Sequence, residues 1–153
     1  IRLSLQEFST EGVLLTNLTD KDRKETEQET YHGNGQLWTR GNFKNGKEEG
    51  LHETYNENGQ LSQKQHYKNG DLDGLSENFY ENGQLSYKRN WKNGKLDRLF
   101  ESYYENGQLK EKTNYKNGKK DGLFEYYYDN GSSLFKNCYK NGEIVDMSSY
   151  CEN

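Results

Sequence analysis

The dipeptide Asn-Gly recurs along this chain in two interleaved series, each with a step of 24 residues. The two series are offset by 11 and 13 residues, so a turn signal arrives about every dozen residues. Asn-Gly is the strongest short hairpin signal, because a type I′ turn needs positive φ at both central residues. The asparagines are Asn34, Asn58, Asn82, Asn106 and Asn130 in one series and Asn45, Asn69, Asn93, Asn117 and Asn141 in the other. The spacing predicts a meander of short antiparallel strands, in which each repeated unit is completed by its neighbours.

The segments between the turns show the two-residue alternation of β-strands. Leu51, Glu53 and Tyr55 are predicted to share one face of a strand. In the next strand Leu61 and Tyr67 are six residues apart, so they too are predicted to share a face. The same pattern recurs 24 residues later at Leu75, Glu77 and Phe79, and at Leu85 and Trp91. Stacked repeats would therefore form rows of leucine and of aromatic rings, each cross-strand pair contributing roughly 0.2–1 kcal/mol.

Composition excludes a thick hydrophobic core. Only 29% of the 153 residues are hydrophobic and none is proline, a balance that alone would suggest disorder. Thirteen tyrosines and a net charge of only −4 oppose disorder. Lysines are scattered among carboxylates, which argues against a nucleic-acid surface, and no apolar run is long enough to span a bilayer.

Two kinds of unit carry a family resemblance. Residues 50–61 (Gly-Leu-His-Glu-Thr-Tyr-Asn-Glu-Asn-Gly-Gln-Leu) and 67–74 (Tyr-Lys-Asn-Gly-Asp-Leu-Asp-Gly) closely resemble the bacterial variant of the MORN repeat, the YwqK-type antitoxin family. The resemblance covers residues 31–142. It implies an all-β fold, an elongated single-layer antiparallel β-meander built from 24-residue hairpin repeats. The family includes proteins encoded beside toxins and proteins of bacterial envelopes.

The chain divides into three parts on this basis. Residues 1–30 are predicted to be an N-terminal cap and degenerate half repeat, with 19–30 a mobile connection or short helix. Residues 31–142 form five repeats of about ten strands, and 143–153 form a C-terminal cap, because repeat arrays need capped ends. Two departures stand out: Arg98 replaces the glycine of Gly50, Gly74 and Gly122, and Ser133 replaces a leucine.

No catalytic, metal or cofactor site is expected. Glutamates at equivalent repeat positions would have similar pKa values, whereas an acid–base pair needs different ones, so they are predicted to be structural. The three histidines lie at three different repeat positions and lack the converging companions of a metal site. The glycines lie in Asn-Gly turns, not in phosphate-binding loops. The residues concerned are Glu53, Glu77, Glu101 and Glu125, and His32, His52 and His66.

Cys138 and Cys151 are expected to be free thiols, since two cysteines make neither a disulfide framework nor a zinc site. A single bridge fixing the C-terminus is the alternative if the protein is exported.

The face opposite the glutamates becomes aromatic toward the C-terminus, and this change is not demanded by the repeat. Such rings are either covered by residues 143–153 or offered to a partner. The predicted partner-binding residues are Tyr80, Phe100, Tyr104, Phe124, Tyr126 and Tyr128. Lysines beside the second turn series have acidic neighbours, so a solubilising edge is preferred to a lipid-binding one.

These observations predict a non-enzymatic scaffold for protein–protein recognition. The family resemblance favours an antitoxin or immunity-like role, with a toxin as partner. The alternative is an envelope-associated or secreted interaction and adhesion module. We expect a cytoplasmic location for the first, and an envelope or secreted location for the second if a leader before Ile1 was removed.

Overall fold

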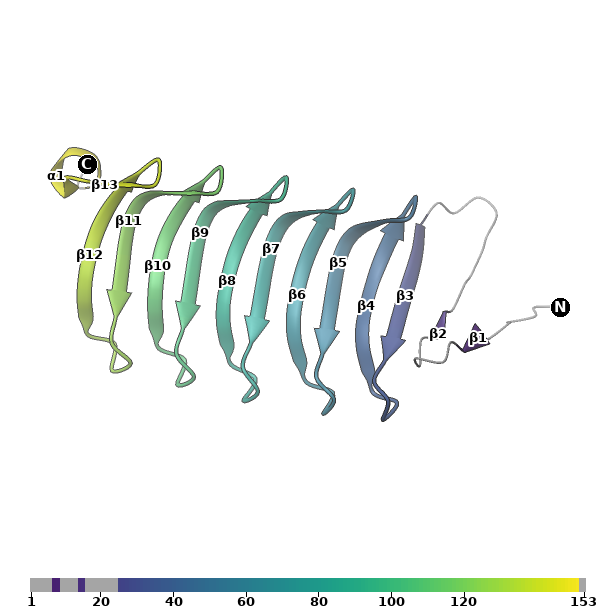
Figure 1. Ribbon diagram of the computed structural model, residues 1–153. Coiled ribbons are helices and arrows are strands. Elements are labelled where there is room, and N and C mark those ends of the chain that lie inside the picture. The colour runs from purple at the N-terminus through teal and green to yellow at the C-terminus, as the bar shows by residue number, and fades with distance from the viewer. Residues whose placement is uncertain (1–6, 9–13, 16–24, 152–153) are drawn as a thin grey trace.

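The computed structural model describes residues 7–8, 14–15 and 25–151. Eleven antiparallel strands form one open sheet in which every strand pairs with its neighbours in sequence (Figure 1). The strands are β3 (Glu25–Tyr31), β4 (Leu37–Lys44), β5 (Lys47–Tyr55), β6 (Leu61–Lys68), β7 (Asp71–Phe79), β8 (Leu85–Lys92), β9 (Lys95–Tyr103), β10 (Leu109–Lys116), β11 (Lys119–Tyr127), β12 (Ser133–Lys140) and β13 (Glu143–Val145). A separate pair, β1 (Glu7–Phe8) and β2 (Leu14–Leu15), precedes them, and the one-turn helix α1 (Met147–Tyr150) follows. The all-β repeat meander predicted from the sequence is confirmed.

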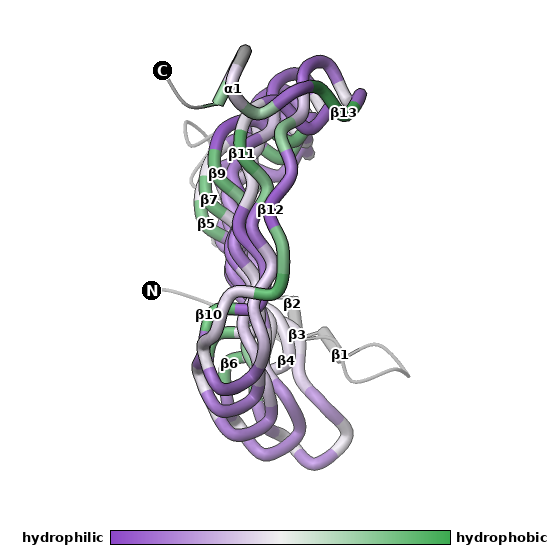
Figure 2. The backbone as a smooth tube through the Cα atoms, turned by 90° about the vertical axis from the view of Figure 1, so that its left-hand side faces the viewer, coloured by the Kyte–Doolittle hydropathy of each residue, from purple (hydrophilic) through white to green (hydrophobic). Residues whose placement is uncertain are grey.

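The two series of Asn-Gly turns have different geometries. In the second series both residues have positive φ, 53° at Asn45 and 75° at Gly46, as a type I′ turn requires. In the first series only the glycine does, with φ of 81° at Gly59, whose N–H donates to the Asn56 carbonyl. This is a type I turn followed by a left-handed glycine, the longer hairpin loop. Both rows of turns are hydrophilic and lie at opposite ends of the strands (Figure 2).

A β-bulge near the start of each even-numbered strand changes which side chains share a face. Tyr55 pairs with Leu61 but Thr54 pairs with Gln63, so Ser62 is an extra residue in β6. One extra residue moves all later side chains to the opposite face. The prediction that Leu61 and Tyr67 share a face is therefore wrong.

A second register shift occurs in β5, β7, β9 and β11, near the residue that is usually glycine. Between Gln65–Ser76 and Tyr67–Leu72, β7 has two more residues than β6. Gly74 has φ of 117° at this point, and Arg98 has φ of 67° at the equivalent point of β9. Figure 1 shows the resulting strands as bent rather than straight.

Both ends of the sheet differ from the prediction. Residues 25–30 are not a connection or helix, because they pair with β4 along its length and complete the first hairpin; the rest of 1–24, apart from β1 and β2, lies outside the described residues. At the other end, Cys138 and Cys151 form a disulfide, so the prediction of free thiols is wrong. Cys138 is 1% exposed and its Cα lies 6.0 Å from that of Cys151, a separation that suits a bridge.

Candidate functional site

One face of the sheet, here the ion-pair face, carries a row of alternating charges along its middle. Directly paired residues on neighbouring strands lie on the same face, so the strand register defines the row. It runs through Glu29, Arg40, Glu53, Lys64, Glu77, Lys88, Glu101, Lys112, Glu125 and Lys136, one residue from each of β3 to β12. Like charges never lie side by side in it, so the row stabilises the register of the whole array.

The pKa values of three glutamates of this row, Glu53, Glu101 and Glu125, are lowered by their neighbours. Burial alone would raise the pKa of Glu101, but hydrogen bonds from Lys88 and Tyr103 outweigh it and lower the pKa. Lys88 Nζ lies 2.7 Å and the Tyr103 hydroxyl 3.0 Å from Glu101 Oε2. Glu53 is held in the same way by Arg40, at 2.6 Å. These contacts give the row the structural role predicted from the sequence.

The opposite face, here the ring face, has a middle row that combines small and large residues. It runs through Gln28, Gly41, His52, Gln65, Ser76, Arg89, Phe100, Thr113, Phe124 and Asn137. Ser76 and Thr113 are fully buried because larger side chains flank them. A row of aromatic rings lies beside this row. This second row consists of Phe43, Tyr67, Trp91, Tyr115 and Tyr139. The His52 ring contacts the first two of these rings, Phe43 and Tyr67.

At the C-terminal end the ring face becomes a cluster of stacked rings. Phe135 stacks on Tyr126 with centroids 5.6 Å apart and on Phe124 at 5.7 Å, and Tyr139 meets Phe124 edge-on at 5.9 Å. Lys120 Nζ lies 3.9 Å from the centroid of Phe124. These contacts leave Phe124 only 6% exposed, while Phe135 is 43% exposed. We call Phe124, Tyr126, Phe135 and Tyr139 the terminal ring cluster.

The six residues predicted to bind a partner fall into two groups. Phe100, Phe124 and Tyr126 lie on the ring face, and the last two belong to the terminal ring cluster. Tyr80, Tyr104 and Tyr128 open the first-series turns instead. The Tyr80 hydroxyl donates to the Tyr103 carbonyl at 2.7 Å, and Tyr104 to the Tyr127 carbonyl at 2.8 Å, so both connect successive hairpins.

The C-terminal segment does not cover the terminal ring cluster. Cys138, to which it is tethered, pairs with Leu123 on the ion-pair face. The Tyr150 hydroxyl donates to Asp121 Oδ1 at 2.7 Å, and α1 lies at the end of the sheet, past β12 (Figure 1). The interpretation that residues 143–153 cap the aromatic face is therefore wrong for residues 146–151, whereas Ile144 of β13 borders that face beside Tyr139.

Exposed apolar side chains gather at the same end of the molecule. The structure describes seven large exposed ones, and five belong to the last hairpin and the segment after it: Tyr128, Leu134, Phe135, Ile144 and Tyr150. Ile144 pairs with Tyr139, so it extends the terminal ring cluster. Sequence reasoning missed Phe135, Tyr139 and Ile144, because Ser133 made the last hairpin look degenerate and the bulges moved the later rings of each even strand to the ring face.

The remaining candidates are structural or shallow. Each histidine imidazole hydrogen-bonds to a backbone carbonyl: His32 to Tyr55, His52 to Asn42 and His66 to Leu75. Within the described part of the chain, no three His, Cys, Asp or Glu side chains are placed to hold a metal ion. No helix among those residues is long and apolar enough to cross a membrane.

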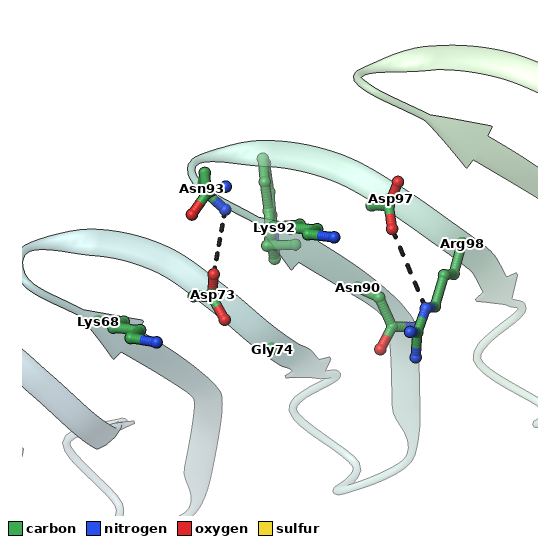
Figure 3. A pocket seen from close by; sticks show the side chains of 9 residues that line it. Lys68, Asp73, Gly74, Asn90, Lys92, Asn93, Asp97 and Arg98 are labelled. Atoms are coloured by element: carbon green, nitrogen blue, oxygen red, sulfur yellow. Dashed lines mark hydrogen bonds and ion pairs between the residues drawn. The ribbon is translucent and has the colours of Figure 1, made fainter.

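A pocket of about 390 Å³ lies beside Arg98, where two hairpins meet (Figure 3). Asp73 Oδ2 in this pocket accepts a hydrogen bond from the Asn93 N–H at 3.1 Å. Asp97 Oδ2 forms an ion pair with Arg98 Nε at 4.0 Å. Because both carboxylates already have partners, the pocket has no unpaired acidic group with which to bind a ligand.

No curated protein matches the chain. A solved structure of accessory secretory protein 1, 2 and 3 of Streptococcus pneumoniae is 17% identical, over 79% of this chain and 23% of that one, with a TM-score of 0.38. This chain thus spans about a quarter of that structure's length, and the likeness carries no functional argument.

The family model for the MORN repeat variant matches five segments: residues 24–45, 48–69, 72–93, 99–117 and 120–141. Each segment covers all or part of one odd-numbered strand and the whole of the even-numbered strand after it. The fourth segment is shorter and starts directly after Arg98, the residue that departs from the repeat's glycine. The first begins before β3, in agreement with the hairpin that β3 forms with β4. Because the matches span most of the sheet, the chain belongs to the MORN repeat variant family.

Proposed function

We propose that this chain is a non-enzymatic scaffold for protein recognition, and that its terminal ring cluster is the binding surface. Repeats of this family generally mediate interactions with proteins or membranes. The observation that carries the proposal is that the C-terminal segment docks on the ion-pair face, so Phe135 stays 43% exposed on the ring face. Aromatic anchors beside a polar rim are typical of protein interfaces.

Charge supports a protein partner over a polyanion. The lysines of the ion-pair face lie opposite glutamates, and Lys120 of the ring face lies over Phe124 and 3.7 Å from Glu111. A nucleic acid or an anionic bilayer would need unpaired, clustered positive charge. Stacked rings on a rigid sheet would lose little conformational entropy on binding, which favours affinity.

The test is a double substitution, Tyr126→Ser with Phe135→Ser, measured against a partner captured from the native source and identified by mass spectrometry. Anchors of this kind commonly cost 2 kcal/mol or more when truncated, so affinity should fall at least about thirtyfold. Trp38→Ser is the matched control, since Trp38 is an equally exposed ring at the other end of the sheet. If the double variant keeps its fold and binds within threefold of wild type, the terminal ring cluster is not the binding surface.

The disulfide bears on where this recognition takes place. Bridges persist in oxidising compartments and are rare in the cytosol, so Cys138–Cys151 favours the envelope or secreted module over a cytoplasmic antitoxin. Alkylation of free thiols in intact source cells, followed by mass spectrometry, separates the two. An unmodified, bridged peptide pair supports the exported setting. Alkylated cysteines support the immunity-like role in the cytoplasm, for which a toxin is the expected partner.

A further inference from the structure

The last full strand of the sheet is paired along only part of its outer side. β12 pairs with β13 through Cys138, Tyr139 and Lys140. Among the described residues, no strand pairs with Ser133–Asn137 on the side away from β11, and we call this side the β12 edge. The first residues of β6, β8 and β10 are half-buried, whereas Ser133 to Lys136 are exposed. The β12 edge thus presents unpaired backbone hydrogen-bonding groups.

The repeat explains why this edge is open. β13 occupies the place of the first three residues of the next odd-numbered strand, 24 residues after Lys119–Asp121. Asp146 then follows where Gly122 stands one repeat earlier, and it caps α1 by accepting from the Ser148 N–H at 3.0 Å. The chain leaves the sheet there, and the disulfide holds it on the ion-pair face. Beside β12, the rest of the place that a full odd-numbered strand would fill therefore stays unoccupied among the described residues.

The charge row shows what would fit there. Lys64 lies between Glu53 and Glu77, and Lys112 lies between Glu101 and Glu125. Lys136 pairs with Glu125 at 2.6 Å on one side only. A strand with a carboxylate opposite Lys136 would continue the alternation of the row.

Among the described residues, Tyr128, a turn residue at the same end of the sheet, lacks the side-chain hydrogen bond that its repeat equivalents Tyr80 and Tyr104 make. Tyr80 and Tyr104 each donate to a backbone carbonyl of the following hairpin. Tyr128, the next tyrosine of this series, is 48% exposed, and its hydroxyl has no equivalent acceptor within the described part of the chain. An added strand could supply a backbone carbonyl to this hydroxyl.

We propose that the partner adds an extended, acidic strand antiparallel to β12, with a carboxylate opposite Lys136. This inference rests on the proposed function, since the β12 edge borders the terminal ring cluster at Phe135. The backbone hydrogen bonds of strand addition supply affinity, and side chains alternating along the strand supply specificity. The array's own strand pairings, repeated along the sheet, provide the template.

The probe is a synthetic peptide of residues 50–57, Gly-Leu-His-Glu-Thr-Tyr-Asn-Glu, taken from β5, which pairs in this way with the outer side of β4. Its glutamate at Glu53 pairs with Arg40 of β4, the repeat equivalent of Lys136, on the side of the even-numbered strand that corresponds to the β12 edge. Binding to the full chain is followed by fluorescence anisotropy of the labelled peptide and by amide hydrogen exchange. We expect slower exchange at residues 133–137, and about fivefold weaker binding of the peptide carrying Glu53→Lys.

Charge exchange supplies the matched control. Lys136→Glu should reverse the preference, so that the Glu53→Lys peptide binds better than the original one. Lys68→Glu, an exposed turn lysine far along the array from β12, should leave the preference unchanged. Reversal in Lys136→Glu alone supports strand addition in this register.

Three results would overturn the inference. One is the absence of peptide binding at millimolar concentration. Another is binding that slows exchange elsewhere but not at 133–137, which would leave the terminal ring cluster as the sole surface. The third is concentration-dependent protection of 133–137 without peptide, which would make a second copy of this chain the occupant. Failure of the Tyr126 and Phe135 substitutions to weaken partner binding would refute the proposed surface without changing the peptide result.

Discussion

The hydroxyl of Tyr104 donates a hydrogen bond of 2.8 Å to the backbone carbonyl of Tyr127, one hairpin further along the sheet. The Tyr80 hydroxyl makes the same contact with the Tyr103 carbonyl one repeat earlier. Two repeats before Tyr80, His32 Nε2 makes it with the Tyr55 carbonyl. At His32, Tyr80 and Tyr104, this turn position therefore joins one hairpin to the next by a side chain as well as by strand pairing. Tyr128 is the next tyrosine of the series, and no complete hairpin follows it among the residues that the structure describes.

Tyr104→Phe should destabilise the protein by about 1 kcal/mol, because it removes one partly buried hydrogen bond and leaves a carbonyl without its donor. Urea unfolding followed by circular dichroism measures the change. Tyr128→Phe is the matched control and should alter stability by less than about 0.5 kcal/mol. Equal effects of the two substitutions would refute the role assigned to Tyr104.

Gly41→Ala should be strongly destabilising. A Cβ at position 41 would overlap Nδ1 of His52, whose ring lies over this glycine. Overpacking of this kind typically costs about 1–3 kcal/mol. In a His52→Ala background the same substitution should cost much less, so a double-mutant cycle of thermal unfolding should give a large coupling energy. Independent effects of the two substitutions would contradict the packing.

Glu101 should contribute to acid unfolding. Burial raises its pKa, but the contacts from Lys88 and Tyr103 more than reverse this, so the folded-state pKa lies below the ordinary value of a glutamate. The unfolded state thus binds this proton more readily, and stability present above about pH 4.5 is lost as pH falls through the folded-state pKa. Urea titrations from pH 7 to pH 2 should show a shallower acid loss for Glu101→Gln. Lys88→Gln should move this loss of stability to higher pH. If the dependence of stability on pH is unchanged in both variants, Glu101 does not contribute to acid unfolding.

Arg98→Gly should stabilise the protein by about 0.5–1 kcal/mol. Arg98 has φ of 67° at a position where Gly74 has φ of 117°, and its side chain is 84% exposed. A left-handed conformation costs a non-glycine residue about 1–2 kcal/mol, part of which is offset by the greater freedom of glycine when unfolded. The reciprocal substitution Gly122→Arg should lower the thermal midpoint. Stabilisation by that change would show that backbone conformation is not what matters here.

Reduction of the Cys138–Cys151 bridge should loosen the C-terminus locally. The bridge closes a loop of sequence separation 13, for which a stabilisation of about 3 kcal/mol is typical. Stability in a repeat array is largely a sum of neighbouring units, so the loss should be confined to β12, β13 and α1. Hydrogen exchange with and without reductant tests this, and Cys151→Ser should be insensitive to reductant. Faster exchange throughout the sheet would indicate a cooperative unit instead.

The sequence by itself determined the repeat, the turns and the row of glutamates. Asn-Gly pairs 24 residues apart specify hairpins through local backbone preference, and two-residue alternation places Glu53 and Glu77 on one face without knowledge of any distant contact. The equivalence of these glutamates also sufficed to assign them a structural role, which the ion pairs at Glu53 and Glu101 confirm.

Only the tertiary structure decided which rings share a face and where the chain leaves the sheet after β13. A bulge at Ser62 adds one residue and moves Tyr67 to the ring face, and the cost of that bulge depends on pairing with β5, not on local sequence. The location of α1 depends likewise on the bridge between Cys138 and Cys151, because a four-residue helix has no stability of its own. That bridge leaves Phe135 exposed, and it is a contact that single-sequence spacing does not specify.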